Sequence, residues 1–485
     1  MRLLLVNTNT CRDPYPVAPL GVCLLASALR DEAEVQVFDG TFRGNEGLRE
    51  TLEAFRPDLV GLSVRNVDDL VPQAGTFFLD EVRRTFLDPL RDARVPLVLG
   101  GSAFSLFPMA LMQAWQADYG VVGEGEGPMR DLLRALDRGE DPRGIPGLLV
   151  AGDREFRPQR SPPSPGRLSL PFSEVDRHID FTPYRVLGAY PIQARRGCNH
   201  RCIYCTYPAL EGHRHRLRDP DEIAREIAEA AARLPGVTFE FVDSTFNDPQ
   251  GHAEAICRAL IRRGPRVRLR TMGVNPGHVT DELIDLMQQA GFAQIDCTPD
   301  SASPRMIRAM GKNFSWEDLV RAARTIRDRG MPTTWFFLFG GPGETAETIQ
   351  ETLDFIDREV SPEDLVLMAI GLRIYPGTPL HRAAIREGIV TPDEDLLAPR
   401  FYISPALGHD RIRDMLKEAA AVRPHCLPPG ENRPDPAMLQ QAIAMRRQQG
   451  LTEPMFRTLL RIRRSWPRFA RVPMPGHAPV ADVTR

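Results

Sequence analysis

The chain has almost no lysine, little excess charge and no long hydrophobic run. Its basic residues are nearly all arginine, because Lys312 and Lys417 are the only lysines, and the net charge of 485 residues is −3. A balance so close to neutral gives no general attraction to nucleic acid or to a membrane surface. No apolar run reaches the roughly 18 to 20 residues that span a bilayer. The apolar start at residues 2–6 is too short for a signal-peptide core, so we expect a cytoplasmic protein without a membrane span and without a nucleic-acid partner.

Cysteine is also scarce, with eight residues in the whole chain. So few cysteines in a long chain without an export signal argue against a disulfide framework. Three of them crowd into residues 198–205, which requires a specific explanation. We interpret the other five as packing residues: Cys11, Cys23, Cys257, Cys297 and Cys426.

The first 150 residues alternate short apolar runs with helical patterns. The runs lie at residues 3–6, 35–38, 59–63, 97–100 and 119–122. This rhythm predicts a flavodoxin-like or Rossmann-like α/β domain with a parallel sheet covered on both faces. Ligands of such sheets bind at the carboxyl ends of the strands. The GxGxxG that marks a dinucleotide site after the first strand is missing, which argues against a plain NAD domain.

The rest of the chain divides into three further segments. Residues 151–185 are rich in Pro, Arg and Ser and are typical of a linker. Residues 186–390 repeat the strand–helix rhythm six times, which predicts a partial (βα)6 barrel with its active face where the strands end. The expected strands lie at residues 191–195, 237–242, 267–272, 293–297, 334–339 and 365–374. Residues 391–485 predict a mainly helical C-terminal segment that caps the substrate site.

The cysteine group has the form CxxxCxxC and follows the first predicted barrel strand. Cys198, Cys202 and Cys205 on one tight loop can each bind one iron of a 4Fe–4S cluster. Three protein ligands leave the fourth iron open to a small chelating molecule. A structural zinc site is the alternative, with His200 as its fourth ligand.

This loop resembles the signature of radical S-adenosylmethionine (SAM) enzymes, including an aromatic residue, Tyr204, before the third cysteine. The resemblance implies a 4Fe–4S cluster whose open iron binds SAM, and reductive cleavage of SAM to a 5′-deoxyadenosyl radical. It covers residues 190–390 and implies further SAM contacts after the later strands. These contacts are Asp243 or Ser244, Ser301, Gly341 in the sequence GGPGET, and Tyr375.

A flavodoxin-like domain before such a barrel resembles the cobalamin-dependent branch of the family. Residues 1–150 contain no histidine, so the Asp-x-His-x-x-Gly loop that supplies cobalt's lower ligand in other cobalamin domains does not exist here. Arg65 should then face the lower side of cobalt, where it would disfavour a bound water. The alternative is that Arg65 pairs with Asp68 or Asp69 at the surface. The resemblance places the other cobalamin contacts at the strand ends, on Asn9, Ser63, Asn66, Gly100, Gly101, Gly123 and Glu124.

Four functions remain open from the sequence. The first is methylation of an unactivated carbon of a small-molecule or natural-product substrate, supported by an electron donor such as flavodoxin or ferredoxin. The second keeps both cofactors for cyclisation, ring contraction or oxidation. The third is a methylthiotransferase, whose leading domain would hold a second cluster on three cysteines. This function lacks support because residues 1–150 contain only two cysteines, Cys11 and Cys23. The fourth is a non-catalytic cobalamin-sensing or redox-sensing module.

Overall fold

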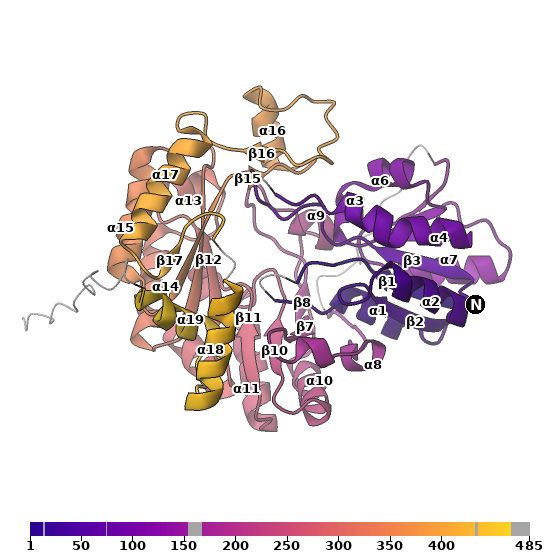
Figure 1. Ribbon diagram of the computed structural model, residues 1–485, viewed down its shortest axis with the longest axis horizontal. Coiled ribbons are helices and arrows are strands. Elements are labelled where there is room, and N and C mark those ends of the chain that lie inside the picture. The colour runs from indigo at the N-terminus through magenta and orange to yellow at the C-terminus, as the bar shows by residue number, and fades with distance from the viewer. Residues whose placement is uncertain (13–14, 74, 154–166, 432–434, 467–485) are drawn as a thin grey trace, which may run out of the picture.

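The computed structural model describes residues 1–12, 15–73, 75–153, 167–431 and 435–466. Two α/β units lie against each other, with the N-terminal unit on the right of Figure 1 and the barrel unit on the left. Among the described residues no helix is both long and apolar enough to cross a membrane.

The N-terminal unit is a six-stranded sheet in the order β2-β1-β3-β4-β5-β6. Its first five strands pair in parallel, as the sequence predicts. The inner strands β1, β3 and β4 are largely buried because helices cover both faces of the sheet, whereas the edge strand β2 is only partly buried. The sixth strand, which the sequence pattern did not reveal, pairs antiparallel with β5. The strands are β1 (Arg2–Asn7), β2 (Glu34–Asp39), β3 (Leu59–Ser63), β4 (Leu97–Gly100), β5 (Tyr119–Val121) and β6 (Leu148–Val150).

The helices of this unit connect successive strands. They are α1 (Leu20–Leu29), α2 (Asn45–Phe55), α3 (Leu79–Val82), η1 (Arg83–Leu87), α4 (Asp88–Ala93), α5 (Ser102–Leu106), α6 (Pro108–Trp115) and α7 (Glu126–Asp137). The predicted linker lies partly outside the described residues, at 154–166. Its described part holds α8 (Val175–His178) and η2 (Thr182–Tyr184).

The barrel unit consists of two parallel sheets, β11-β10-β7 and β12-β13-β14-β17. Isolated bridges from Leu269 to Phe292 and from Val274 to Cys297 connect them, so the strands form an open arc. The main strands are β7 (Tyr190–Ile192), β10 (Thr238–Phe241), β11 (Arg268–Thr271), β12 (Ile295–Asp300), β13 (Thr333–Phe339), β14 (Leu365–Ile370) and β17 (Cys426–Leu427). The helices outside the arc are α10 (Pro220–Arg233), α11 (His252–Arg263), α12 (Asp281–Ala290), α13 (Pro304–Ala309), α14 (Trp316–Asp328), α15 (Ala346–Glu359) and α17 (Gly408–Ala421), with the short η3 (Pro276–His278) after β11.

Two predicted barrel strands are divided in the structure. The run at 191–195 becomes β7 and β8 (Arg195–Arg196), and β8 pairs with β9 (Arg216–Leu217). The run at 365–374 becomes β14 and β15 (Leu372–Arg373), and β15 pairs with β16 (Phe401–Tyr402). Gly371 separates the second pair at φ +82°, a backbone conformation that favours glycine. Both breaks lie at the carboxyl ends of strands and turn the chain toward the N-terminal unit.

The C-terminal segment is mainly helical in its described part, as predicted. It contains α18 (Pro436–Gln449) and α19 (Met455–Arg464), drawn in yellow in Figure 1, and α19 contacts β14. The remaining helices are α9 (Tyr207–Glu211), after the cysteine loop, and α16 (Pro379–Arg386).

The two units share one hydrophobic core. Phe104 and Phe107 of the N-terminal unit belong to the same buried cluster as Met306, Met310 and Leu372 of the barrel. Polar contacts reinforce the junction, including the phenol of Tyr184, which donates to Asp39 at 2.7 Å. Because apolar burial is continuous across the junction, the carboxyl ends of both sheets are held facing a common space.

Candidate cofactor sites between the sheet and the barrel

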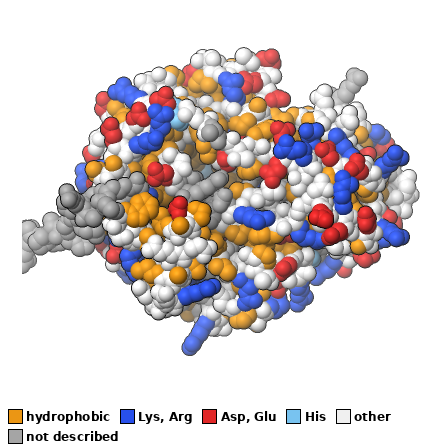
Figure 2. Space-filling view, viewed as in Figure 1, with side chains coloured by type: hydrophobic (Ala, Val, Ile, Leu, Met, Phe, Trp, Pro, Cys, Tyr) orange, Lys and Arg blue, Asp and Glu red, His pale blue; other side chains and the backbone are white. Residues whose placement is uncertain are grey.

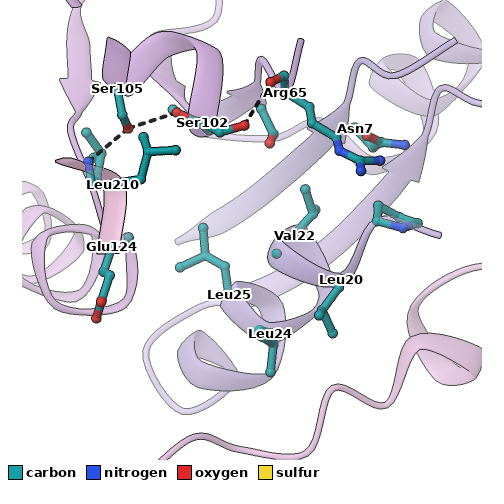
Figure 3. Close-up of a pocket in the computed structure, with 18 of the residues that line it drawn as sticks. Asn7, Leu20, Val22, Leu24, Leu25, Arg65, Ser102, Ser105, Glu124 and Leu210 are labelled. Atoms are coloured by element: carbon teal, nitrogen blue, oxygen red, sulfur yellow. Dashed lines mark hydrogen bonds between the residues drawn. The ribbon is translucent and has the colours of Figure 1, made fainter. Parts of the chain in front are cut away.

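A cavity of about 630 Å³ lies between the two units (Figure 3). It opens at the carboxyl ends of β1, β3, β4 and β5, where parallel sheets bind their ligands. Of the strand-end residues that the sequence predicted, all except Asn9 line it. Those residues are Ser63, Arg65, Asn66, Gly100, Gly101, Gly123 and Glu124.

Asn9 lies outside this lining and is buried in a local turn. Its backbone N–H donates to Asn7 Oδ1 at 3.3 Å, and Asn7 lines the cavity instead. The sequence also did not identify the apolar wall made by Leu20, Leu24 and Leu25 of α1, which Figure 3 shows beside the cavity. A helix face that lines a ligand cavity has the same apolar pattern as a face buried in the core, so the pattern cannot distinguish them.

The glycine turn after β4 shapes one end of the cavity. Gly101 has φ +97°, and a Cβ at this position would lie 2.5 Å from the carbonyl oxygen of Val64. A Cβ on Gly100 would meet nothing closer than 3.9 Å, so its missing side chain leaves room for a ligand to approach the backbone. Ser105 accepts from Gly123 N–H at 2.9 Å and donates to Gly101 O at 2.8 Å, which joins the two glycine turns.

Arg65 projects into the cavity without an ion pair among the described residues. Figure 3 shows its side chain extending into the pocket, on the side where Asn7 is drawn. Both acidic neighbours are engaged elsewhere. Asp68 binds Arg373 at 2.8 Å, and Asp69 accepts from the backbone N–H groups of Val71 and Thr76. The surface pairing considered for Arg65 is therefore absent from the structure.

Glu124 lies at the junction of the two units. Its carboxylate pairs with Arg216 and with Arg196, the latter at 3.1 Å, and both arginines belong to the barrel. Burial opposes ionisation of Glu124, but the two guanidinium groups outweigh it and hold the pKa of the carboxyl below its usual value. The side chain thus joins the two units, and the backbone of this turn remains beside the cavity.

The three cysteines lie on a loop that leads directly into Thr206 and Tyr207, which line the cavity. Cys198 is buried, and Cys202 and Cys205 are half-buried. Backbone bonds fix the loop, since Ile203 N–H donates to Met310 O at 3.0 Å and Leu380 N–H donates to Ile203 O at 2.9 Å. Among the described residues no three His, Cys, Asp or Glu side chains converge as they would around one metal ion. Separate thiols are suited to a cubane cluster, in which each cysteine binds its own iron.

His200 is engaged in a network next to Cys198. Its Nε2 atom bonds to Asp248 and lies 3.0 Å from Asn313 Nδ2. Burial disfavours the imidazolium, but Asp248 and Cys198 outweigh it and raise the pKa of His200 to about 9. The contact with Asp248 engages one of the two ring nitrogens through which His200 could bind a zinc ion.

Tyr204 belongs to a buried network beside the cluster loop. Its hydroxyl donates to Asp300, which also accepts from Lys312 Nζ at 2.8 Å. Asp300 ends β12 with φ +62°, a conformation uncommon for a residue other than glycine. Tyr204 therefore fixes the cluster loop to the end of β12.

The residues predicted to contact SAM lie at the ends of the barrel strands, in different environments. Asp243 Oδ1 accepts from the backbone N–H groups of Ala194 and Arg195 at 2.9 Å, and its Oδ2 is buried without a hydrogen-bond partner among the described residues. Burial raises the pKa of Asp243 to about 6. Ser244 Oγ accepts from the Arg195 guanidinium at 3.1 Å.

The later strand ends are packed more tightly. Ser301 is buried, and its hydroxyl lies 3.2 Å from that of Thr352. A Cβ on Gly341 would lie 2.9 Å from the end of Met310. Tyr375 lines the cavity, with the Arg373 guanidinium 5.0 Å from its ring centroid.

A Rossmann-like sheet facing a partial barrel that carries three cysteines defines a two-cofactor enzyme class. Residues 11–133 match the B12 binding domain, and residues 192–356 match the radical SAM superfamily. The chain belongs to the cobalamin-dependent radical SAM enzymes.

Individual relatives agree with this assignment. The chain is 28% identical to tryptophan 2-C-methyltransferase from Streptomyces laurentii, with 77% of this chain and 72% of the relative covered. It is 27% identical to the anaerobic magnesium-protoporphyrin IX monomethyl ester cyclase of Rubrivivax gelatinosus, covering 73% and 65%. The radical SAM methyltransferase TsrM from Kitasatospora setae, solved with cobalamin and a [4Fe–4S] cluster, superposes with a TM-score of 0.80 at 26% identity over 96% of this chain and 99% of that one.

Proposed function

We propose that this enzyme uses a 4Fe–4S cluster, SAM and cobalamin to methylate a carbon atom of a small-molecule substrate. The observation that carries the proposal is that two loops meet at the cavity between the two units. One is the loop that carries Arg65, and the other is the cysteine loop, which leads into Thr206 and Tyr207 of the cavity lining. The similarity to a tryptophan methyltransferase along most of both chains supports methyl transfer as the outcome.

The chemistry of the cavity lining supports binding of a corrin and its tail. Gly100 and Gly101 leave the backbone open, and Leu20, Leu24 and Leu25 give an apolar wall. When bound, cobalamin carries the methyl group, and the cluster with SAM supplies the one-electron chemistry. We assign the cobalamin to residues 1–150, the cluster and SAM to 186–390, and substrate capping to 391–485, joined by the linker 151–185.

The chain's own residues position the cofactors and keep water away from them. Cys198, Cys202 and Cys205 hold three irons and leave one open for SAM. Asp243 or Ser244, Ser301, Gly341 and Tyr375 complete the SAM site, with Tyr204 fixing the loop. Arg65 would lie beside the bound cobalamin and would not ligate its metal, because a guanidinium offers hydrogen-bond donors but no lone pair. We place the enzyme in the cytoplasm, where a flavodoxin or ferredoxin supplies electrons.

The second candidate is cyclisation or oxidation with the same cofactors. It is favoured by the similarity to the protoporphyrin ester cyclase, which extends over 73% of this chain. The two functions differ in product mass, because only methyl transfer adds a methyl group.

The test is anaerobic purification with reconstitution, followed by iron, sulfide and corrin analysis and incubation with SAM, a reductant and tryptophan as the first substrate. We expect about four irons and one corrin per chain, and transfer of label from methyl-labelled SAM to a product. Replacing Cys198, Cys202 and Cys205 with alanine should remove the iron and the turnover. Zinc in place of iron, or cobalt-free protein after growth with ample vitamin, would refute the proposal.

A further inference from the structure

The inner face of the barrel contains charged residues directly below the cavity. Phe239 and Phe241 of β10 are fully buried in the core that the outer helices complete, so Glu240 between them faces inward. On β11, Leu269 faces the same outer core, and Arg270, which pairs in register with Glu240, faces inward. Two residues further on, Val242 and Met272 line the cavity. Because side chains alternate along a strand, the two charged residues lie one step deeper on the same inner face.

Glu240 and Arg270 neutralise each other. Arg270 Nε lies 2.5 Å from Glu240 Oε1, and the hydroxyl of Tyr15 donates to the same oxygen at 3.2 Å. The guanidinium stacks over the Tyr15 ring, 4.3 Å from its centroid. This arrangement fixes the orientation of Arg270, and its Nη2 atom remains buried without a hydrogen-bond partner among the described residues.

Asp296 of β12 adds a second carboxylate to this region. It lies between the outward-facing Ile295 and Cys297, which are fully buried in the outer core, so it also faces inward. Its Oδ1 atom is buried without a hydrogen-bond partner among the described residues. Burial, followed by the charge of Glu240, raises the pKa of Asp296 to about 7. The charge of Arg270 and a hydrogen bond with Thr334 partly offset this rise, and the Oδ1 atom remains available as an acceptor for a ligand.

We propose that this barrel floor binds the head group of an α-amino acid substrate, with Asp296 accepting from its ammonium group and Arg270 donating to its carboxylate. The inference rests on the proposed function and specifies its substrate class. One free acceptor and one free donor on neighbouring strands complement a zwitterion, whose ammonium and carboxylate groups are attached to the same carbon atom. The apolar side chain of the substrate then extends past Val242 and Met272, which is 39% exposed, into the space shared with the cobalamin site.

The test uses equilibrium dialysis of reconstituted holoenzyme with L-tryptophan, tryptamine and indole-3-propanoate. The last two probes lack the carboxylate and the ammonium group respectively. We expect L-tryptophan to bind, and each analogue to bind about tenfold or more weakly because one buried group stays unpaired. In Asp296→Asn, L-tryptophan should bind about thirtyfold or more weakly, and no better than indole-3-propanoate.

Asp364 provides a matched control at the amino end of β14. Burial also raises its pKa to about 7, but it accepts from Thr333 N–H at 3.1 Å and from the Trp335 indole at 3.2 Å. Asp364→Asn should lower the melting temperature and leave probe affinity unchanged. Asp296→Asn should raise the melting temperature of the ligand-free protein, because burial disfavours the charged form of this carboxyl group.

The outcomes separate this inference from the proposed function. Equal affinity for the three probes, no binding of any probe, or full L-tryptophan binding by Asp296→Asn would overturn the inference. If corrin, iron and SAM-dependent release of S-adenosylhomocysteine are intact in the same preparation, the proposed function stands without it. If the preparation holds no corrin or cluster, both fall.

Discussion

At the scale of single residues, Arg65 shows why neighbouring charges in a sequence do not establish a salt bridge. Asp68 and Asp69 follow it closely, yet one binds the barrel and the other caps a turn. Because these contacts engage both carboxylates, the guanidinium of Arg65 remains in the cavity without an ion pair among the described residues. The three cysteines show the opposite case, because their spacing alone defines a loop that can hold a cluster.

Replacing Arg65 with alanine should change the environment of cobalt without unfolding the protein. Removal of the guanidinium would admit a water to the lower face, which the paramagnetic resonance spectrum of the reduced bound corrin would detect as an added axial oxygen ligand. We expect turnover to fall about tenfold, or ~1.4 kcal/mol of barrier. Arg138→Ala, at an exposed helix end, serves as the control and should change neither signal. An unaltered spectrum in Arg65→Ala would place Arg65 away from the cobalt.

At the scale of elements, the described residues after β3, 64–73 and 75–78, are anchored to the barrel. Asp68 and Arg373 are each 3% exposed, and Arg373 also donates to the backbone oxygens of Ile374 and Leu396. Gly371 allows close approach, because a Cβ there would lie 3.0 Å from the ring of Pro72. The loop that carries Arg65 is thus positioned by a strand more than 300 residues away in sequence.

Replacing Asp68 with asparagine should destabilise both the protein and the cobalamin site. The buried Arg373 would lose its counterion, which typically lowers the free energy of unfolding by about 3–5 kcal/mol. We expect a lower melting temperature together with weaker corrin binding, measured by thermal denaturation and by corrin retention on gel filtration. Asp69→Asn, which alters only hydrogen bonds within the loop, should have a smaller effect on both. Wild-type corrin retention in Asp68→Asn would show that the anchor does not position the loop.

At the scale of the whole molecule, ionic contacts hold the two units face to face beside the cavity. Glu124 and Glu126 of the N-terminal unit bind Arg196 and Arg216 of the barrel. Since the pKa of Glu124 is lowered in the folded protein, its ion pairs stabilise the fold above its unfolded pKa, and this contribution is lost as the pH falls through the folded value.

Replacing Glu124 with glutamine should therefore reduce stability near neutral pH by about 1–3 kcal/mol, the usual contribution of charged hydrogen bonds. The difference from the wild type should vanish as the pH falls below about 4, the range in which glutamate protonates. Thermal denaturation across this pH range measures it. Glu32→Gln removes a surface carboxylate that binds Arg134 within the same unit, and should change the melting temperature little. A Glu124→Gln deficit that persists in acid would assign its effect to packing.

Much of the fold followed from local patterns, because parallel strands buried on both faces leave continuous apolar runs. The five parallel strands of the first unit and the six strand positions of the barrel were predicted correctly. The breaks at β8 and β15 and the late strand β17 were not, since each depends on pairing with distant chain rather than on periodicity. The three-dimensional arrangement was also needed to show that α1 lines the cavity, and that Asn7 lines it in place of Asn9.

The sequence by itself determined the chemistry of this protein, since three thiols at fixed spacing define a cluster loop and the lack of histidine in residues 1–150 removes an imidazole from beneath cobalt. Only the tertiary structure decided how that chemistry is arranged, because salt bridges and burial join residues far apart in the chain. It freed Arg65 by binding Asp68 to the barrel, turned His200 toward Asp248, and left the Oδ1 atom of Asp296 without a hydrogen-bond partner among the described residues of the barrel floor. Spacing along a chain fixes which groups share a loop, whereas packing fixes which of them remain available to a ligand.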